Sequence, residues 1–214
     1  MVNLNIVKLS AGHAFGLDGR AMAAANTPME HVTDLDQYKI SRESLREFNV
    51  LVVTDFIDQE FLNENRDVIE AFLNDGNIVL ACTHIFRNWL PGVNPFMPKI
   101  IYKHSDYEMQ IVKEDSIFRG VDLKELAYRK GVSGFYARGY HPLTNPQAEV
   151  WLAFNDGTPI TYADRTTTKG TIVAHAARDF LTYSTGDNTT QLISKQTLEW
   201  LSMELDRLAK GQQS

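Results

Sequence analysis

Two short segments that are apolar at every position constrain the fold of this chain more than any other feature. They are Val50–Val53 and Ile78–Ala81, and a strand that is apolar on both sides must be covered on both faces, as a central strand of a parallel sheet is. Between them, apolar residues from Asp58 to Leu73 recur at helical spacing, and Gly76 stands where a C-terminal helix cap is expected. This strand–helix–strand order predicts right-handed βαβ units in an α/β fold.

The rest of the chain extends the same alternation of strands and helices. Ser41 is the predicted N-cap of a helix that runs through Phe48, and the region of Trp89 to Pro98 is rich in proline, which excludes helix. The other expected strands are Leu4–Leu9, Glu30–Leu35, Met109–Val112, Val150–Phe154, Ile160–Tyr162 and Thr171–His175, and the other expected helices are Arg20–Ala25 and a final one with Leu198, Leu201, Leu205 and Leu208 on one stripe. We therefore predict a three-layer, flavodoxin-like α/β fold, whose mostly parallel sheet is flanked by helices and carries antiparallel additions at its edge.

The length and composition are those of one folded domain. The chain has 214 residues, 43% of them hydrophobic and 22% charged, which is enough apolar surface for a full core. No repeat, low-complexity tract or linker divides it. We expect a single domain over residues 1–209 and a frayed polar tail over residues 210–214.

The charge pattern argues against nucleic acid and membrane surfaces as partners. The net charge of −6 at pH 7 repels phosphate groups, and the basic residues are scattered. No window approaches the roughly 18 consecutive apolar residues that span a bilayer, and the N-terminus lacks a signal-peptide pattern. Because the single Cys82 cannot form an internal disulfide, we expect a soluble cytoplasmic protein.

Three segments, taken in order, resemble one protein family. Asn74–Cys82 is similar to a glycine turn, strand and elbow, and Ser116–Val121 resembles a stretch that reads His-Pro-Ile, two variable residues, Gly and Leu or Val. The closing block runs from Lys169–Val173 to Leu198–Leu201 and ends in Trp-Leu. The chain thus resembles the class I glutamine-amidotransferase-like superfamily, especially its ThuA-like and related non-amidotransferase branches. The resemblance implies a glutamine-amidotransferase-like α/β domain.

The same resemblance points to a cysteine–histidine pair. Cys82 falls at the position of the superfamily's nucleophile, where a sharp strand-to-helix turn exposes the sulfur and a helix N-terminus lowers its pKa. His175 ends a strand near the position of the partner base, and Asp179 is the available group to orient it. The resemblance therefore implies a catalytic set of Cys82, His175 and Asp179.

The sequence departs from the amidotransferase pattern around both residues. Ala81 and Thr83 replace the glycines of the elbow, and Ala176-Ala177 follows His175 where Pro and Glu are usual. The alternative is that Cys82 is a small buried side chain that ends a core strand, and that His175 is a strand-end histidine bonded to a backbone carbonyl. Glutaminase activity itself is not expected.

Polar residues that follow the predicted strands are candidates for ligand binding, because ligands of open α/β sheets bind beyond the carboxyl ends of the strands. A helix beginning at Thr83 would present free N–H groups and Arg87 to an anion. In the alternative interpretation Phe86 and Trp89 cover the sheet edge and Arg87 is solvated. The candidates at strand ends are His13, Asp55, Thr83, His84, Arg87 and Arg178.

The stretch Phe135–His141 is a second candidate binding segment. Arg138 can clamp a carboxylate or phosphate, and aromatic residues supply stacking faces. His141 precedes Pro142, but Leu143 replaces the Glu of the amidotransferase His-Pro-Glu motif. We therefore predict ligand binding by Arg138 and His141, with a structural loop as the alternative.

No cofactor or metal is predicted. The six histidines are dispersed, without paired zinc-ligand spacing, so a zinc site would have to combine distant loops carrying His13, His84 and His175. Phosphate-loop and dinucleotide fingerprints are missing. Homodimers are the commonest soluble oligomers, so a homodimer is the default expectation.

Two functions from different classes remain open. The first is an amidotransferase-like domain without glutaminase activity that serves as a small-ligand-binding or assembly module. The second is a small-molecule hydrolase or transferase with a Cys82–His175 dyad, acting on a sugar-related substrate as the ThuA-like resemblance implies. The exposure and reactivity of Cys82 discriminate between them.

Overall fold

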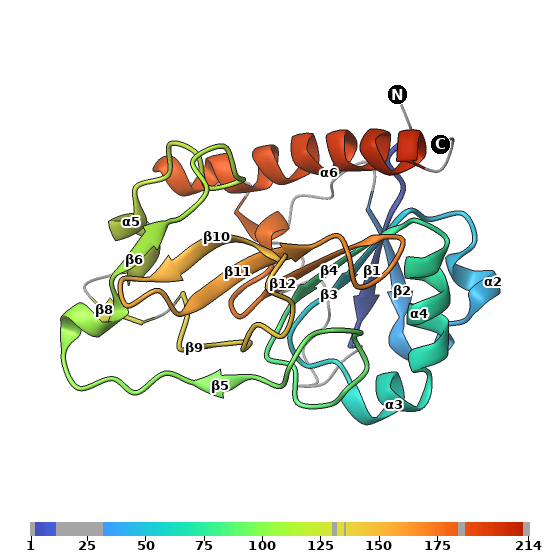
Figure 1. Ribbon diagram of the computed structural model, residues 1–214, viewed down its shortest axis with the longest axis horizontal. Coiled ribbons are helices and arrows are strands. Elements are labelled where there is room, and N and C mark those ends of the chain that lie inside the picture. The colour runs from blue at the N-terminus through green and yellow to red at the C-terminus, as the bar shows by residue number, and fades with distance from the viewer. Residues whose placement is uncertain (1–2, 12–31, 130–131, 135, 184–186, 212–214) are drawn as a thin grey trace.

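The computed structural model describes residues 3–11, 32–129, 132–134, 136–183 and 187–211. An eight-stranded sheet forms its centre, in the order β2-β1-β3-β4-β12-β11-β10-β6 (Figure 1). The strands are β1 (Ile6–Ser10), β2 (Val32–Asp36), β3 (Val50–Val53), β4 (Ile78–Cys82), β6 (Met109–Ile111), β10 (Glu149–Phe154), β11 (Pro159–Asp164) and β12 (Thr171–His175).

The sheet is parallel in its first part and antiparallel at one edge. Strands β2, β1, β3, β4 and β12 pair in parallel, whereas β11, β10 and β6 are added antiparallel. The predicted α/β class, with antiparallel additions at the edge, is therefore confirmed. The shorter strand pairs are β5 (Met97–Pro98) with β9 (Gly139–Tyr140) and β7 (Tyr128–Arg129) with β8 (Val132–Ser133).

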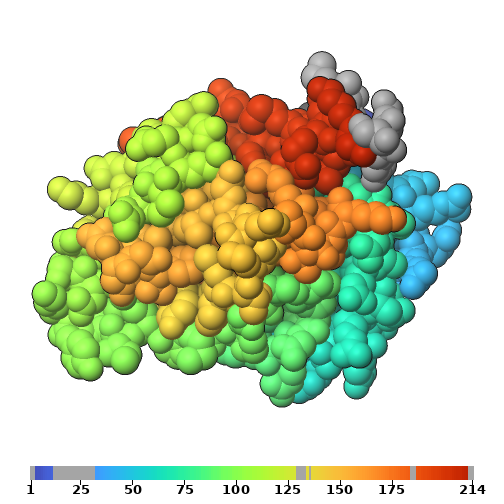
Figure 2. All heavy atoms as spheres, viewed as in Figure 1, coloured from blue at the N-terminus to red at the C-terminus, as the bar shows by residue number. Residues whose placement is uncertain are grey.

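Helices cover both faces of the sheet, which gives three layers (Figure 1). The helices α2 (Arg42–Leu45), α3 (Gln59–Glu64) and α4 (Arg66–Asn74) pack on one face, and α5 (Leu123–Ala127) and α6 (Leu192–Gly211) pack on the other. In the space-filling view α6 (red) lies directly against the orange strands and the green segment near α5 (Figure 2). The single-turn 3₁₀ helices are η1 (Gln37–Lys39), η2 (His104–Tyr107), η3 (Phe180–Thr182) and η4 (Thr189–Gln191).

The two central strands are buried on both sides, as their sequence predicts. Every residue of β3 and β4 is buried. Val50 and Val52 contribute to the core cluster beneath α6, while Leu51 and Val53 contribute to the cluster beneath α3 and α4. Alternate residues of one strand thus supply two separate cores, because successive side chains point to opposite faces.

The helix predicted between β3 and β4 is two helices. Asp58 caps α3 by accepting a hydrogen bond from the backbone N–H of Phe61. Asn65 then leaves helical geometry at φ −105°, and its side chain donates to the Phe61 carbonyl at 2.8 Å. An asparagine that competes with the backbone for hydrogen bonds breaks a helix in this way. The prediction of one continuous helix is wrong at this residue.

The predicted helix boundaries hold at some ends and fail at others. Ser41 forms a capping box with Ser44 and starts α2 as predicted, but α2 ends at Leu45. Gly76 has φ 84° and closes α4, a conformation that favours glycine. The helix α6 continues through Gly211, so the expected frayed tail is helical over residues 210–211. The predicted helix Arg20–Ala25 and residues 212–214 lie outside the described residues.

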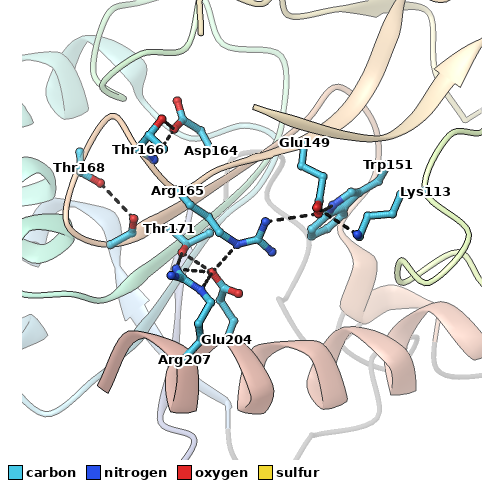
Figure 3. Close-up of polar contacts among 11 residues, drawn as sticks. Lys113, Glu149, Trp151, Asp164, Arg165, Thr166, Thr168, Thr171, Glu204 and Arg207 are labelled. Carbon is cyan, nitrogen blue, oxygen red and sulfur yellow. Dashed lines mark hydrogen bonds and ion pairs between the residues drawn. The ribbon is translucent and has the colours of Figure 1, made fainter. Parts of the chain in front are cut away.

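A buried polar network ties α6 to the edge of the sheet where the parallel strands begin (Figure 3). Glu204 of α6 is 4% exposed, and its Oε1 accepts hydrogen bonds from Arg165, Arg207 and the Thr171 hydroxyl at 2.6–3.0 Å. Arg165 also pairs with Glu149 at 3.3 Å. Although burial opposes it, hydrogen bonds from Arg207, Arg165 and Thr171 hold the pKa of Glu204 below its ordinary value. We call Glu149, Arg165, Thr171, Glu204 and Arg207 the Glu204 network.

Candidate functional site

The carboxyl ends of β3, β4 and β12 lie side by side and carry the candidate site. Val53 is in register with Ala81, and Cys82 is in register with His175. The residues that follow these strands therefore emerge at one edge of the sheet, the edge where ligands of open α/β sheets bind. Asp55, His84 and Arg178 reach this edge from three different loops.

A pocket of about 170 Å³ opens between these loops. Gly134, Tyr136 and Arg138 form its remaining wall, and an antiparallel bridge joins the neighbouring Ala137 to Ala177. Gly134 has φ 76°, and its carbonyl accepts a hydrogen bond from Arg138 Nε at 2.9 Å. We call the cavity lined by Asp55, His84, Gly134, Tyr136, Arg138, Ala177 and Arg178 the strand-end pocket.

Asp55 and His84 form the acidic and imidazole side of the strand-end pocket. Loss of hydration raises the pKa of Asp55, against the opposing effects of His84, a hydrogen bond from Thr83 and the charge of Arg178. Burial lowers the pKa of His84, against the opposing effects of Asp55 and a hydrogen bond to the Ala176 carbonyl. Burial thus favours the neutral form of both side chains, and the attraction between them opposes it. His84 stacks on Phe96 with ring centroids 3.8 Å apart, which fixes the plane of its ring.

Two guanidinium groups form the basic side of the same pocket. Arg138 and Arg178 are both exposed. Among the described residues, Arg138 bonds through its Nε to the Gly134 carbonyl, and the Arg178 side chain makes no hydrogen bond or ion pair. The N–H groups that these contacts leave over can bind an anionic group, for which guanidinium geometry is well suited. The structure thus brings together Asp55, His84, Arg138 and Arg178 of the predicted site residues.

Cys82 lies beneath the pocket and belongs to the core. Its side chain is fully buried within the cluster under α6, and burial raises the pKa of its thiol well above the usual value. The segment after β4 carries no helix over residues 83–96, so the expected helix at Thr83, with its free N–H groups, is absent. Because a nucleophilic cysteine needs an exposed thiolate of lowered pKa, the geometry matches the alternative of a buried core thiol.

His175 contacts hydroxyl groups through both ring nitrogens. Its Nδ1 lies 2.7 Å from Thr161 Oγ1, and its Nε2 lies 3.3 Å from the Tyr136 hydroxyl. Burial lowers the pKa of His175 to about 3, so the ring is neutral at physiological pH. Since Tyr136 also lines the strand-end pocket, His175 supports the floor of the pocket from below.

Asp179 is engaged by a lysine, whereas the sequence pattern suggested a partnership with His175. Its Oδ2 lies 2.7 Å from Lys8 Nζ, and its Oδ1 accepts the backbone N–H of Leu181. Asp179 is buried at 6% exposure. The predicted role of Asp179 in orienting His175 is therefore not matched by these contacts.

The other predicted binding residues point elsewhere. His141 is buried, with Nδ1 3.0 Å from the Asn94 carbonyl and Nε2 3.0 Å from the Thr83 carbonyl, the arrangement of a structural loop residue. Arg87 pairs with Glu60 of α3. Thr83 is buried and serves the site by its hydrogen bond to Asp55. His13 lies outside the described residues.

Three residues of the site region were not predicted as site residues. Tyr136 lies inside the aromatic stretch that the sequence singled out, so composition could have suggested it. Lys8 and Thr161 gave no signal, because their proximity to Asp179 and His175 follows from the strand order, which places residues 14 to 171 positions apart side by side.

The described ranges carry neither a cluster of metal ligands nor a helix suited to cross a bilayer. No group of three or more His, Cys, Asp or Glu side chains is positioned there to hold a metal ion. None of the helices there has the length and apolar character needed to cross a bilayer.

Comparison with known proteins gives similarity at the level of fold. No family model matches the chain, and no curated protein matches it significantly. Among solved structures, a GMP synthase-like protein from Thermoplasma acidophilum is similar with a TM-score of 0.58 and 9% identity, over 99% of this chain and 98% of that one. The cytoplasmic protein STM3548 of Salmonella typhimurium is similar with a TM-score of 0.56 and 12% identity, over 92% and 98%.

A third structure extends the comparison. The cytoplasmic protein STM1381 of Salmonella typhimurium LT2 has a TM-score of 0.53 and 11% identity, over 96% of this chain and 99% of that one. At such identities the likeness concerns the fold and carries no site residue across. The chain has a flavodoxin-like α/β fold.

Proposed function

We propose that this protein is a small-ligand-binding module that holds an anionic ligand in the strand-end pocket and has no glutaminase activity. One observation carries the proposal. Two guanidinium groups, those of Arg138 and Arg178, lie at one pocket, and among the described residues they have N–H groups without an acceptor. The pocket lies beyond the carboxyl ends of parallel strands, the usual ligand position in open α/β sheets. A cavity smaller than the roughly 300–1,000 Å³ typical of drug-sized ligands favours a small molecule.

The ThuA-like resemblance remains part of this proposal. It suggests sugar-related chemistry, which belongs to the alternative of a Cys82–His175 enzyme, and it is compatible with a domain that has lost the amidotransferase triad. The buried Cys82 supports a binding role over thiol catalysis.

The binding proposal is tested by titrating ¹⁵N-labelled protein with small anions: phosphate, sulfate, succinate, citrate and glycerate. We expect saturable shifts of the backbone amides of His84, Ala177 and Arg178. The double variant Arg138→Gln/Arg178→Gln should abolish them, while Arg66→Gln on α4 removes an exposed charge outside the pocket and should leave them unchanged. Shifts that stay linear and spread over the whole surface for every anion would sink the proposal.

The rival thiol mechanism has its own test. We expect Cys82 to resist iodoacetamide between about pH 6 and 9 until the protein unfolds, because the thiolate is the reactive form and burial disfavours it. Labelling of the folded protein at the rate of the unfolded chain, with a midpoint well below about 8.5, would restore the Cys82–His175 dyad.

A further inference from the structure

The strand-end pocket places hydrogen-bond acceptors beside its two cations, and this combination restricts the ligand further than its charge does. The Asp55 side chain is exposed at the pocket and has Thr83 as a neighbour. Within the described residues no cation lies within ion-pair distance of its carboxylate. An ionised carboxylate only accepts hydrogen bonds and has about four acceptor sites. The described residues therefore leave most of the acceptor capacity of Asp55 unused.

His84 adds a second acceptor to the same wall. His84 lines the pocket beside Asp55, and burial lowers the pKa of its imidazole. A neutral imidazole has one N–H and a lone pair on the other nitrogen, so the ring can accept a hydrogen bond. The stack on Phe96 holds this ring in place, so the acceptor is fixed before a ligand arrives.

Tyr136 gives the pocket a wall without a fixed charge. Its hydroxyl is turned toward the core, 3.3 Å from Nε2 of the buried His175, and His175 Nδ1 lies 2.7 Å from Thr161 Oγ1. The polar groups that the pocket offers to a ligand are therefore those of Asp55, His84, Arg138 and Arg178.

We infer that the ligand of the strand-end pocket is a small hydroxy acid, with its acid group held by Arg138 and Arg178 and an adjacent hydroxyl group donated to Asp55 or His84. This inference rests on the proposed function and names the ligand class for it. A bare anion of the same size would place its charge next to the Asp55 carboxylate and leave both acceptors without donors. A neutral polyol would satisfy the acceptors but leave two guanidinium groups unpaired.

The test compares three probes of matched size by calorimetry and amide shifts. Glycerate carries both a carboxylate and hydroxyl groups, propionate carries only the carboxylate, and glycerol carries only the hydroxyl groups. We expect glycerate to bind about tenfold or more tightly than either, the ratio that a hydrogen bond to a charged group supports. Glycerol 3-phosphate is a fourth probe, and its affinity relative to glycerate tells whether the acid group is a phosphate or a carboxylate.

A variant isolates the acceptor. Asp55→Asn should weaken the affinity for glycerate by several-fold, because an amide oxygen is a weaker acceptor than a carboxylate, while propionate binds the variant at least as well as the wild type because a repelling charge is gone. Asp34→Asn on β2 makes the same charge change at an exposed position away from the pocket and should alter neither affinity. Thermal unfolding of both variants verifies that they are folded.

The outcomes separate the two levels of the proposal. Equal affinities for glycerate and propionate, unaffected by Asp55→Asn, would overturn the hydroxy-acid inference and leave the anion-binding function intact. Failure of all four probes to shift the pocket amides would overturn both. A several-fold loss of glycerate affinity confined to Asp55→Asn, with propionate binding retained, is the expected result.

Discussion

The two ends of the parallel strands carry similar charged side chains, which are paired with one another at one end and largely unpaired among the described residues at the other. At the beginning of the strands, the Glu204 network combines Arg, Glu and Thr side chains that satisfy one another beneath α6 (Figure 3). At the carboxyl ends, Asp55, Arg138 and Arg178 line a pocket with much of their hydrogen-bonding capacity unused. Paired, buried charges stabilise a fold through their partners, whereas unpaired charges at a pocket are available to a ligand. Whether charged side chains already have hydrogen-bond and ion-pair partners, more than which residue types they are, distinguishes a structural cluster from a candidate site.

The strongest test of this contrast is Glu204→Ala. We expect the free energy of unfolding to fall by about 3 kcal/mol, because the variant removes the buried acceptor shared by the Thr171 hydroxyl, the partly buried Arg165 and the half-exposed Arg207. Chemical denaturation measures the change. Glu199→Ala, on the same helix with a half-exposed ion pair to Lys195 at 3.9 Å, should cost no more than about 0.5 kcal/mol. Equal losses in the two variants would contradict a structural role for the network.

The buried His175 beneath the pocket should make the free energy of unfolding depend on pH. The pKa of His175 is lowered to about 3 in the folded protein, against about 6.5 in the unfolded chain. Between these values the unfolded state binds more protons, so stability is lost as pH falls from about 6.5 toward 3. His175→Gln should flatten the curve of unfolding free energy against pH by up to about 1.4 kcal/mol per pH unit.

Imidazole NMR signals provide a direct control for the His175 prediction. The ring of His175 should remain neutral down to about pH 4.5, since its folded pKa is about 3. A ring that titrates near pH 6.5 in the folded protein would contradict the buried, hydroxyl-bonded geometry.

The thiol beneath the pocket should behave as part of the core. Cys82→Ser places a hydroxyl in a fully buried, apolar position, and we expect a loss of about 1 kcal/mol in stability. Anion binding in the strand-end pocket should persist, because Cys82 is not among its lining residues. Loss of binding with unchanged stability would place the thiol in the functional machinery.

The smallest effect is expected in the pocket itself. Because loss of hydration raises the pKa of Asp55, its charged form slightly disfavours the folded state at neutral pH. Asp55→Asn should leave the stability within about 0.5 kcal/mol of the wild type or raise it, in contrast to Glu204→Ala. A clear destabilisation would indicate that Asp55 has a structural partner and would weaken the comparison between the two strand ends.

Much of the fold could be predicted from local patterns, and most of the pocket could not. The apolar runs of β3 and β4, the cap at Ser41 and the turn at Gly76 were each visible within a few residues of sequence. Tyr136 and Arg138 line the pocket beside the bridge between Ala137 and Ala177. No local pattern encodes a contact between positions 40 residues apart in the chain, so the wall of the pocket was assigned only as a candidate binding stretch.

The sequence by itself determined the α/β class, the buried central strands and the set of polar residues at the strand ends, because hydrophobic periodicity and caps act over short distances. Only the tertiary structure decided which of those residues meet. Strand order and register placed Asp55, His84 and Arg178 at one pocket and buried Cys82 beneath it. They also brought Asp179 into an ion pair with Lys8. The physical reason is that exposure and ionisation depend on the whole surroundings of a side chain, which the residues next to it in sequence do not specify.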